Sequence, residues 1–249
     1  MSLPSTRTMP SADPSTLSDY TMSDQERMSK ARNYFAWQGR MVRPHLGRRV
    51  VEFGCGIGNF TRMLLDRDAV IAVDVEPECV ERLRRRYPDR PNLHVSAIDA
   101  DGFGLSALAR FRPDSCVCLN VLEHIDDDRR TLEQMASILP SGGAIVLMVP
   151  AFPALSGPID RNLGHYRRYR RESIRQLARG ASLTVEKLHY MNLAGFFGWW
   201  MNARIFQLEI QSRGQIAIFD RLIVPGMSTI ERISPPPFGQ SLFAVLRKR

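Results

Sequence analysis

The sequence predicts an α/β protein built on a doubly wound, mostly parallel sheet. Between residues 49 and 150, short runs of apolar residues alternate with stretches of helical periodicity. Continuously apolar runs are typical of strands in a parallel sheet that helices cover on both faces. A glycine-rich turn follows the first run, and an aspartate ends the second. Polar groups at the carboxyl ends of parallel strands are where such sheets bind ligands.

The order of the predicted elements supports this fold class. Pro77 suits the first turn of a helix, and Gly142 and Gly143 suit the passage from a helix into a strand. The predicted strands are 50–53, 70–73, 93–95, 115–119 and 144–149, and the predicted helices between them are 57–66, 77–87, 105–111 and 127–139. After a loop rich in Pro, Gly and Arg come a predicted helix at 172–179 and predicted strands at 183–190 and 241–247.

Three segments lie outside this alternating pattern. Residues 1–18 are rich in Ser, Thr, Pro and Asp and are predicted to be a disordered leader. Residues 19–48 are predicted to form a helical cap that begins at a capping box of Ser23 and Glu26. The binding domain, 49–249, contains an apolar, aromatic insertion at 191–238, partly helical and closed by three prolines. Its aromatic side chains are interpreted either as part of the core or as a lid over a hydrophobic ligand.

Composition excludes some classes and leaves others open. The 249 residues are 44% apolar and 24% charged, as in ordinary globular domains, and the net charge is +8. Arginines carry this charge. They indicate nucleic acid, an anionic membrane surface or an anionic substrate as a partner, or else simply lie on solvated helix faces. The stretch 191–206 is too short to span a bilayer, and no secretory signal is evident. We expect a cytoplasmic protein.

The four cysteines do not predict a metal site or a disulfide framework. Cys116 and Cys118 alternate along one predicted strand, and no pair has the spacing of a zinc knuckle. Cys55 and Cys79 are far apart in the sequence. Reduced thiols are therefore expected for all four, and no bound metal is expected.

The strongest motif is the glycine turn after the first strand. Glu52, Gly54, Gly56 and Gly58 follow one another at two-residue spacing, so the pattern is Glu-x-Gly-x-Gly-x-Gly. A nicotinamide fingerprint needs a glycine at position 59, which is asparagine here. Glycines let a backbone approach a ligand closely. Three further polar groups follow the second, third and fourth strands, and they are Asp74, Asp99 and Asn120. A carboxylate at position 74 can accept both hydroxyls of a ribose.

This order of motifs resembles the class I S-adenosylmethionine (SAM)-dependent methyltransferases over residues 20–249. The resemblance implies a Rossmann-like, seven-stranded sheet with an antiparallel last strand. It implies SAM as cofactor and S-adenosylhomocysteine as product. The run Leu122-Glu123-His124 is similar to the branch that acts on small molecules. The implied cofactor-binding residues are Glu52, Gly54, Cys55, Gly56 and Asn59 at the methionine part, Asp74 and Val75 at the ribose, Asp99 and Ala100 at the adenine, and Asn120 below the sulfonium.

Two segments resemble bacterial small-molecule methyltransferases more narrowly, at 164–169 and 236–242. The expected function is therefore methylation of a small molecule in specialised metabolism, with an oxygen or nitrogen acceptor favoured over carbon. Methyl transfer is an in-line displacement, so the enzyme mainly positions the nucleophile. The acceptor itself is expected to be hydrophobic or anionic.

A hydroxyl acceptor also needs a base within hydrogen-bond reach. The candidate catalytic residues are His165, His124 and Tyr166, with Glu123 and Asp160 behind them. His165 is preferred, because a loop histidine can approach the acceptor from the side opposite the sulfonium. A purely structural role for either histidine stays open. The arginines of 167–171 either clamp an anionic substrate group or start a solvated helix.

Two other functions compete with this one. Amino-methylating nucleic-acid enzymes typically carry Asn or Asp, then Pro-Pro-aromatic, after the fourth strand. This chain has Asn120-Val121-Leu122-Glu123 and no evident RNA-binding module, so nucleic acid is not the expected partner. The second alternative is a non-enzymatic protein that docks on membranes through its tryptophan-rich insertion and its arginines. The oligomeric state is not predicted.

Overall fold

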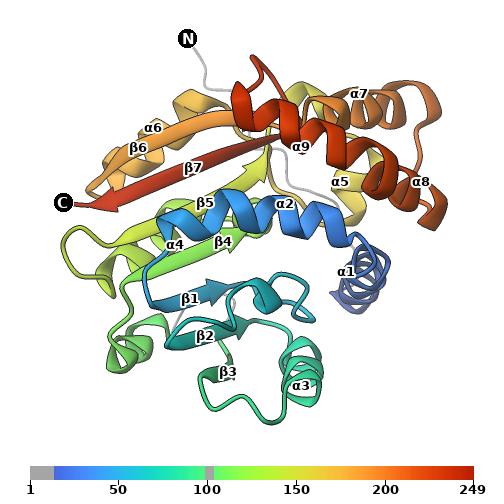
Figure 1. Ribbon diagram of the computed structural model, residues 1–249. Coiled ribbons are helices and arrows are strands. Elements are labelled where there is room, and N and C mark those ends of the chain that lie inside the picture. Colours follow the sequence, from blue (N-terminus) through green and yellow to red (C-terminus); the bar gives the residue numbers. More distant parts are fainter. Residues whose placement is uncertain (1–13, 99–103) are drawn as a thin grey trace.

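The computed structural model describes residues 14–98 and 104–249, and within them seven strands form one sheet covered by helices on both faces (Figure 1). The strand order is β3-β2-β1-β4-β5-β7-β6. Strands β1 to β5 pair in parallel, and β7 runs antiparallel to both β5 and β6. The strands are β1 Arg49–Phe53, β2 Ala69–Asp74, β3 Leu93–Ala97, β4 Ser115–Leu119, β5 Ala144–Pro150, β6 Leu183–Met191 and β7 Ser241–Lys248. The predicted doubly wound sheet is confirmed.

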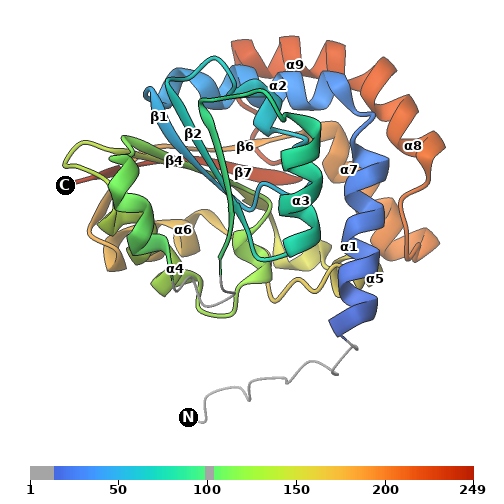
Figure 2. The ribbon, with the colours of Figure 1, turned by 90° about the horizontal axis from the view of Figure 1, so that it is seen from below.

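Two layers of helices cover this sheet, as Figure 2 shows. On one face α2 and α9 pack over the strands, and on the other α4 and α6 do so. The helices are α1 Pro14–Met28, α2 Arg32–Val42, α3 Pro77–Arg86, α4 Asp128–Ser137, α5 Pro158–Asn162, α6 Arg171–Gly180, α7 Leu193–Met201, α8 Arg213–Ile218 and α9 Val224–Ile233. All seven residues of β5 are buried, which explains why its run is apolar without alternation.

Short helical turns connect these elements. The 3₁₀ turns are η1 Arg43–His45, η2 Thr61–Met63, η3 Leu105–Phe111, η4 Leu122–His124 and η5 Pro153–Leu155, and two π-helical turns are η6 Asn202–Phe206 and η7 Phe219–Ile223. One of them corrects a prediction. The expected helix at 57–66 is wrong, because the structure has only η2 in this segment. Gly58 has φ +82°, outside the right-handed helical region, and Phe60 and Leu64 are instead buried in the core against α2.

The N-terminal cap also differs from the prediction. Helix α1 begins at Pro14, so residues 14–18 of the expected leader are helical. Ser23 lies inside α1, where its hydroxyl accepts a hydrogen bond from Arg27, so the predicted capping box does not start the helix. Residues 29–31 divide the cap into α1 and α2, because the chain turns there to bury Ala31 and the inner face of α2 against the sheet.

The insertion between β6 and β7 is helical over most of its length. Trp199 is nearly buried against Leu155 and Ile159, so this part of α7 is core. Other apolar side chains of the insertion face outward, with Leu222 75% and Ile233 82% exposed. None of the helices within 14–98 and 104–249 combines the length and the apolar character needed to cross a membrane.

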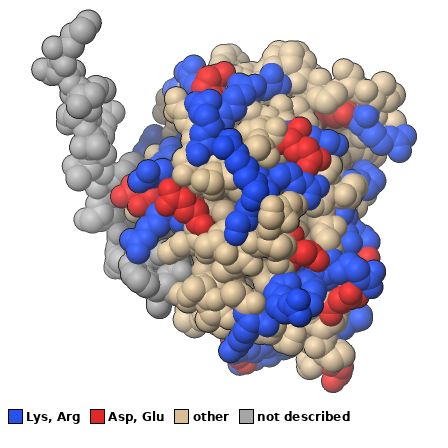
Figure 3. Space-filling view, turned by 90° about the vertical axis from the view of Figure 1, so that its left-hand side faces the viewer, with Lys and Arg blue, Asp and Glu red and all other residues tan. Residues whose placement is uncertain are grey.

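The arginines of the surface are spread over many elements, and some of them are paired with acids. Arg82 pairs with Glu78, and Arg85 pairs with Glu81, one helical turn apart on α3. On the face drawn in Figure 3, Lys and Arg side chains are interspersed with Asp and Glu and with uncharged residues. Exposed pairs of this kind contribute little to stability and keep the surface solvated. On α3, the arginines therefore lie on a solvated helix face, which is one of the interpretations that the sequence left open.

Candidate active site

The glycine turn after β1 is shaped for close approach. Gly54, Gly56 and Gly58 have φ of +75°, +51° and +82°, which a residue with a side chain rarely adopts. A Cβ at Gly54 would come within 2.3 Å of Val121 Cγ2, at the end of β4. The backbone N–H of Gly54 donates to the carbonyl of Val73, which ties the turn to β2. The predicted turn is confirmed, although no α-helix follows it.

Asp74, at the end of β2, accepts hydrogen bonds from the backbone of this turn and of the residues after β2. Its Oδ2 accepts a hydrogen bond from the Gly56 N–H at 2.7 Å, and its Oδ1 accepts one from Glu76 N at 3.1 Å. Burial raises the pKa of Asp74, and these backbone hydrogen bonds oppose the rise. Asp74 is thus built into the turn. Next to it, Val75 is 44% exposed.

Glu52 is a buried acid of β1, two residues before the first glycine of the turn. It is 4% exposed, and its Oε2 has no hydrogen-bond partner among the described residues. Burial raises the pKa of Glu52 to about 8, while the neighbouring Thr61 side chain lowers it and the nearby Asp74 raises it further. A buried carboxyl without a partner is costly, and a cationic ligand group beside it would remove that cost.

The other predicted cofactor residues divide into three kinds. Cys55 packs among Ala72 and Leu83, so only its backbone faces the turn. Asn120 is exposed at the end of β4, with φ +54° and its N–H bonded to Met148. Asp99 and Ala100 lie outside the described residues.

Helix α1 crosses the glycine turn, a contact that the sequence did not reveal. Gln25 Oε1 accepts a hydrogen bond from Ile57 N at 2.9 Å, and Asn59 Nδ2 donates to the Gln25 carbonyl at 2.9 Å. A Cβ at Gly56 would lie 2.2 Å from Gln25 Oε1. At its other end, α1 reaches the insertion through the Tyr20 hydroxyl, which donates to the carbonyl of Glu209. Only a fold brings these segments together.

The two predicted catalytic histidines lie side by side. Their rings stand perpendicular with centroids 4.6 Å apart, although His124 follows β4 and His165 follows α5. His165 Nδ1 lies 2.9 Å from Asp160 Oδ1. Asp160 is itself held by Arg168, whose guanidinium donates to both carboxylate oxygens at 2.7 and 3.1 Å. This places the Nε2 of His165 as the ring nitrogen free to meet a ligand.

The charge states within this cluster differ because the environments differ. Burial and the neighbouring His165 lower the pKa of His124 to about 3, so its imidazole is neutral. Burial raises the pKa of Glu123 to about 7, and His165 partly opposes this. Burial also raises the pKa of Asp160, but the His165 hydrogen bond and the Arg168 charge outweigh it and bring the pKa to about 2. His124 is therefore poorly suited to accept a proton.

Tyr166 and the arginine run are placed differently from the histidines. Tyr166 joins the cluster only through its backbone, whose N–H donates to the Glu123 carbonyl, while its side chain is 53% exposed. Arg168 is buried on Asp160, and Arg167 pairs with Asp126 and Asp128. These two arginines are already neutralised by acids of the protein. Neither an anion clamp nor a solvated helix start describes this part of the run.

Glu123, His124 and His165 also form a possible set of metal ligands. Each offers one ligand atom, and these atoms all lie within 4.8 Å of one another. No metal was expected from the sequence, since no cysteine pair has the spacing of a zinc knuckle, and the two histidines of this set are 41 positions apart.

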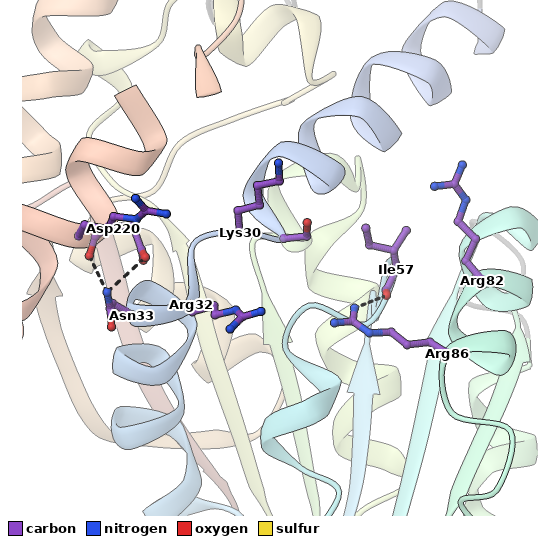
Figure 4. A pocket seen from close by; sticks show the side chains of 9 residues that line it. Lys30, Arg32, Asn33, Ile57, Arg82, Arg86 and Asp220 are labelled. Carbon is purple, nitrogen blue, oxygen red and sulfur yellow. Dashed lines mark hydrogen bonds between the residues drawn. The ribbon is translucent and has the colours of Figure 1, made fainter. Parts of the chain in front are cut away.

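A basic cleft of about 830 Å³ lies on the other side of α1, where α1, α2, α3 and η7 approach the glycine turn (Figure 4). Arg32 and Arg86 point toward each other across it. Lys30, Arg32 and Arg221 form no ion pair with a described residue. The acid in the lining, Asp220, accepts a hydrogen bond from Tyr34 N. The cleft therefore suits an anionic group.

The residues beneath the turn fit SAM. The unpartnered oxygen of Glu52 would meet the ammonium group of the methionine part. The three glycines of the turn lack side chains, so its backbone is open to close approach. Asp74 lies at the strand end where a ribose is expected.

Comparisons with known proteins agree with this arrangement. A family model described as a methyltransferase domain matches residues 21–188. Trans-aconitate 2-methyltransferase of Rhodococcus jostii (strain RHA1) is 35% identical over 130 residues, 50% of this chain and 47% of the relative. An uncharacterised methyltransferase of Exiguobacterium sibiricum is 39% identical over 100 residues, 39% of this chain and 43% of the relative. The chain thus spans about half the length of the curated relatives it matches.

Solved structures share the fold over nearly the whole chain. A chain from the complex of the Haloferax volcanii Trm112 methyltransferase activator matches with a TM-score of 0.63 and 20% identity, covering 95% of this chain and 97% of that one. A SAM-dependent methyltransferase from Mesorhizobium loti matches with a TM-score of 0.56 and 17% identity, covering 89% and 100%. With the family match over most of the chain and the strand order 3-2-1-4-5-7-6, the chain belongs to the class I SAM-dependent methyltransferases.

Proposed function

We propose that this protein transfers the methyl group of SAM to an oxygen or nitrogen atom of a small molecule that carries an anionic group. The observation that carries this proposal is the position of the histidine cluster relative to the glycine turn. Val121 packs on Gly54, and Glu123 and His124 come two and three residues later, in η4. The groups able to activate an acceptor thus begin two residues from the cofactor cradle.

The elements around the cluster support a small acceptor. Trp199 of α7 donates from Nε1 to Asp160 at 3.3 Å, so the insertion borders the cluster on one side. Asp24 of α1 lies close enough to His165 for their charges to interact, so α1 borders it on another. Both segments come from outside the sheet. We propose that they form the lid that excludes water during transfer.

Two observations favour an acceptor with an anionic group. Lys30, Arg32 and Arg221 line the cleft beside the glycine turn without an acidic partner of their own. Trans-aconitate, which the Rhodococcus jostii relative is named for, is a carboxylate. Placement in specialised metabolism is a further proposal that rests on the resemblance alone.

The reaction asks two things of the site. The acceptor must lie in line with the bond between the methyl carbon and sulfur, which α1, α7 and η4 would arrange by position. A hydroxyl acceptor must also lose its proton as the carbon–oxygen bond forms. His165 is the residue of the cluster on which this activation depends, because Asp160 orients its ring and leaves Nε2 free.

The test is methyl transfer from labelled SAM to a panel of small carboxylates and phosphates that includes trans-aconitate, with neutral analogues and a structured RNA as comparisons. We expect labelled product with an anionic small molecule and none with its neutral ester. Labelling of the RNA alone would favour the nucleic-acid alternative. Binding of neither SAM nor S-adenosylhomocysteine in calorimetric titration would overturn the proposal altogether.

A further inference from the structure

The cluster of Glu123, His124 and His165 has the arrangement of a metal site. The three ligand atoms lie within 4.8 Å of one another and come from two segments of the fold, η4 and the loop after α5. Nitrogen and oxygen ligands bind first-row cations at about 2.0–2.2 Å, so atoms sharing one cation lie about 3–4 Å apart. The spacing in this cluster is compatible with a single shared ion after a small contraction.

One atom of the cluster lacks the partner that its burial demands. Glu123 is 1% exposed, and its Oε2 has no hydrogen-bond partner among the described residues. Buried carboxylates are normally paired, hydrogen-bonded or bound to a metal. The nearest groups that could serve it are the two imidazoles, and no hydrogen bond joins them to it in the structure. A cation between the three side chains would satisfy this oxygen.

Both imidazoles are oriented as ligands usually are. His165 is hydrogen-bonded through Nδ1 to Asp160, which Arg168, Gly157 N and Trp199 hold in turn. The His124 ring lies against the backbone of Leu163, which favours its protonated form. Metal-ligating histidines almost always donate their second ring nitrogen to a carboxylate or a carbonyl, which fixes the ring and its tautomer. Each ring therefore keeps one nitrogen available for a cation.

We propose that Glu123, His124 and His165 bind one divalent transition-metal cation beside η4. Two imidazoles and a carboxylate suit zinc, iron, manganese or cobalt better than magnesium or calcium, which prefer oxygen ligands. Three protein ligands leave positions open, as in catalytic metal sites. The binding of the cation stands on this geometry alone, whereas its role rests on the proposed function.

In that role, the open position takes the acceptor's oxygen or nitrogen. A cation lowers the pKa of a bound hydroxyl, so the proton leaves to solvent before transfer. The acceptor oxygen then forms its bond to the methyl carbon while the carbon–sulfur bond breaks and its electron pair stays on sulfur. S-adenosylhomocysteine leaves neutral at sulfur. His165 would act here as a ligand.

The test measures metal binding without SAM or acceptor, so that its failure is distinct from failure of the proposed function. Chelator-treated protein is dialysed against Co²⁺ or Zn²⁺, bound metal is counted, and the visible absorption of bound Co²⁺ is recorded. We expect one equivalent for the unaltered protein and for His94→Gln, which changes an exposed histidine on β3. We expect Glu123→Gln and His165→Asn to bind at least 10-fold more weakly. We expect Asp160→Asn, which keeps all three ligands but weakens the contact that orients His165, to bind about 10- to 100-fold more weakly.

Two results would overturn the proposal. The first is unaltered protein that binds no Co²⁺ and whose thermal midpoint does not rise with added Zn²⁺, since a ligand of the folded state must raise it. That measurement needs no variant and holds even where a substitution prevents folding. The second is folded Glu123→Gln and His165→Asn variants that bind the metal as tightly as His94→Gln. The cluster would then be a proton-transfer site without a cation.

Discussion

The cofactor end of the candidate active site, at the glycine turn, and its acceptor end, at the histidine cluster, are built in different ways. At the cofactor end, residues 52–59 form the turn as one continuous segment, and Asp74, the Val73 carbonyl and Gln25 hold it through hydrogen bonds. At the acceptor end, η4, the loop after α5, and α7 each contribute one or two groups. A local structure can be recognised from its sequence, because its residues act as neighbours. A site assembled from distant segments depends on packing, and no motif in the sequence marks the residues that form it.

The largest expected effect concerns the acceptor end. His165→Ala removes the group on which acceptor activation depends, so we expect turnover to fall about 10²- to 10⁴-fold while SAM affinity stays nearly unchanged. Single-turnover methyl transfer at saturating SAM measures the first, and calorimetric titration measures the second. His94→Gln is the control. A turnover like that of the control would remove His165 from the chemistry, and a parallel loss of SAM affinity would mean that the two ends are not separate.

At the cofactor end, Asp74→Ala should weaken binding of S-adenosylhomocysteine by about 2–4 kcal/mol, because two charge-assisted hydrogen bonds are lost. The Gly56 N–H also loses its acceptor, so the turn itself should be less well held. Calorimetric titration of the variant beside Asp89→Ala, an exposed aspartate, tests this. Unchanged affinity would transfer the ribose contact to Glu76.

Glu52 should make stability depend on pH. Its pKa rises from 4.5 to about 8 on folding, so between these values the folded state keeps a proton that the unfolded chain has lost. The free energy of unfolding should therefore fall as pH rises through this window, by up to about 1.4 kcal/mol per pH unit. Urea unfolding across the window, compared with Glu52→Gln, isolates this contribution. Equal slopes in both proteins would mean that Glu52 is already ionised in the folded state.

Binding of SAM should remove the proton that Glu52 keeps in the folded state. If the ammonium group of the cofactor lies at Glu52, binding near neutral pH should release about one proton from the protein. Titration in buffers of different ionisation enthalpy counts that proton. Release that is equal in Glu52→Gln would place the ammonium elsewhere.

The smallest effect concerns the helix that joins the two ends. Gln25→Ala removes the hydrogen bond between α1 and Ile57, which should destabilise the docking of α1 by about 0.5–1.5 kcal/mol. Trypsin should then cut more quickly after Arg27, and cofactor with acceptor should slow cutting in the unaltered protein. Gln176→Ala, on an exposed position of α6, is the control. Cutting rates that no ligand changes would make α1 and the insertion fixed parts of the core.

Much of the fold followed from local patterns. The central strands are continuous apolar runs because both faces of the sheet are covered, and all seven strands were placed within two residues of their observed ends. The helix expected at 57–66 failed for a tertiary reason. Phe60 and Leu64 have helical spacing, but the turn is bent by Gly58, against which Leu83 of α3 packs closely. Periodicity reports which side chains are buried without reporting the backbone that buries them.

By itself, the sequence determined the sheet, the glycine turn and the acid at the end of β2, because each depends on residues close in the chain or on strand ends that a parallel sheet aligns. Tertiary structure alone decided that Gln25 lies over Gly56, that Arg168 is buried on Asp160, and that His124 and His165 meet. These contacts join segments separated by 8 to 41 positions or come from different layers, and no periodicity encodes them. The chemistry at the acceptor end depends on these contacts, since packing sets which nitrogen is free and which carboxyl lacks a partner.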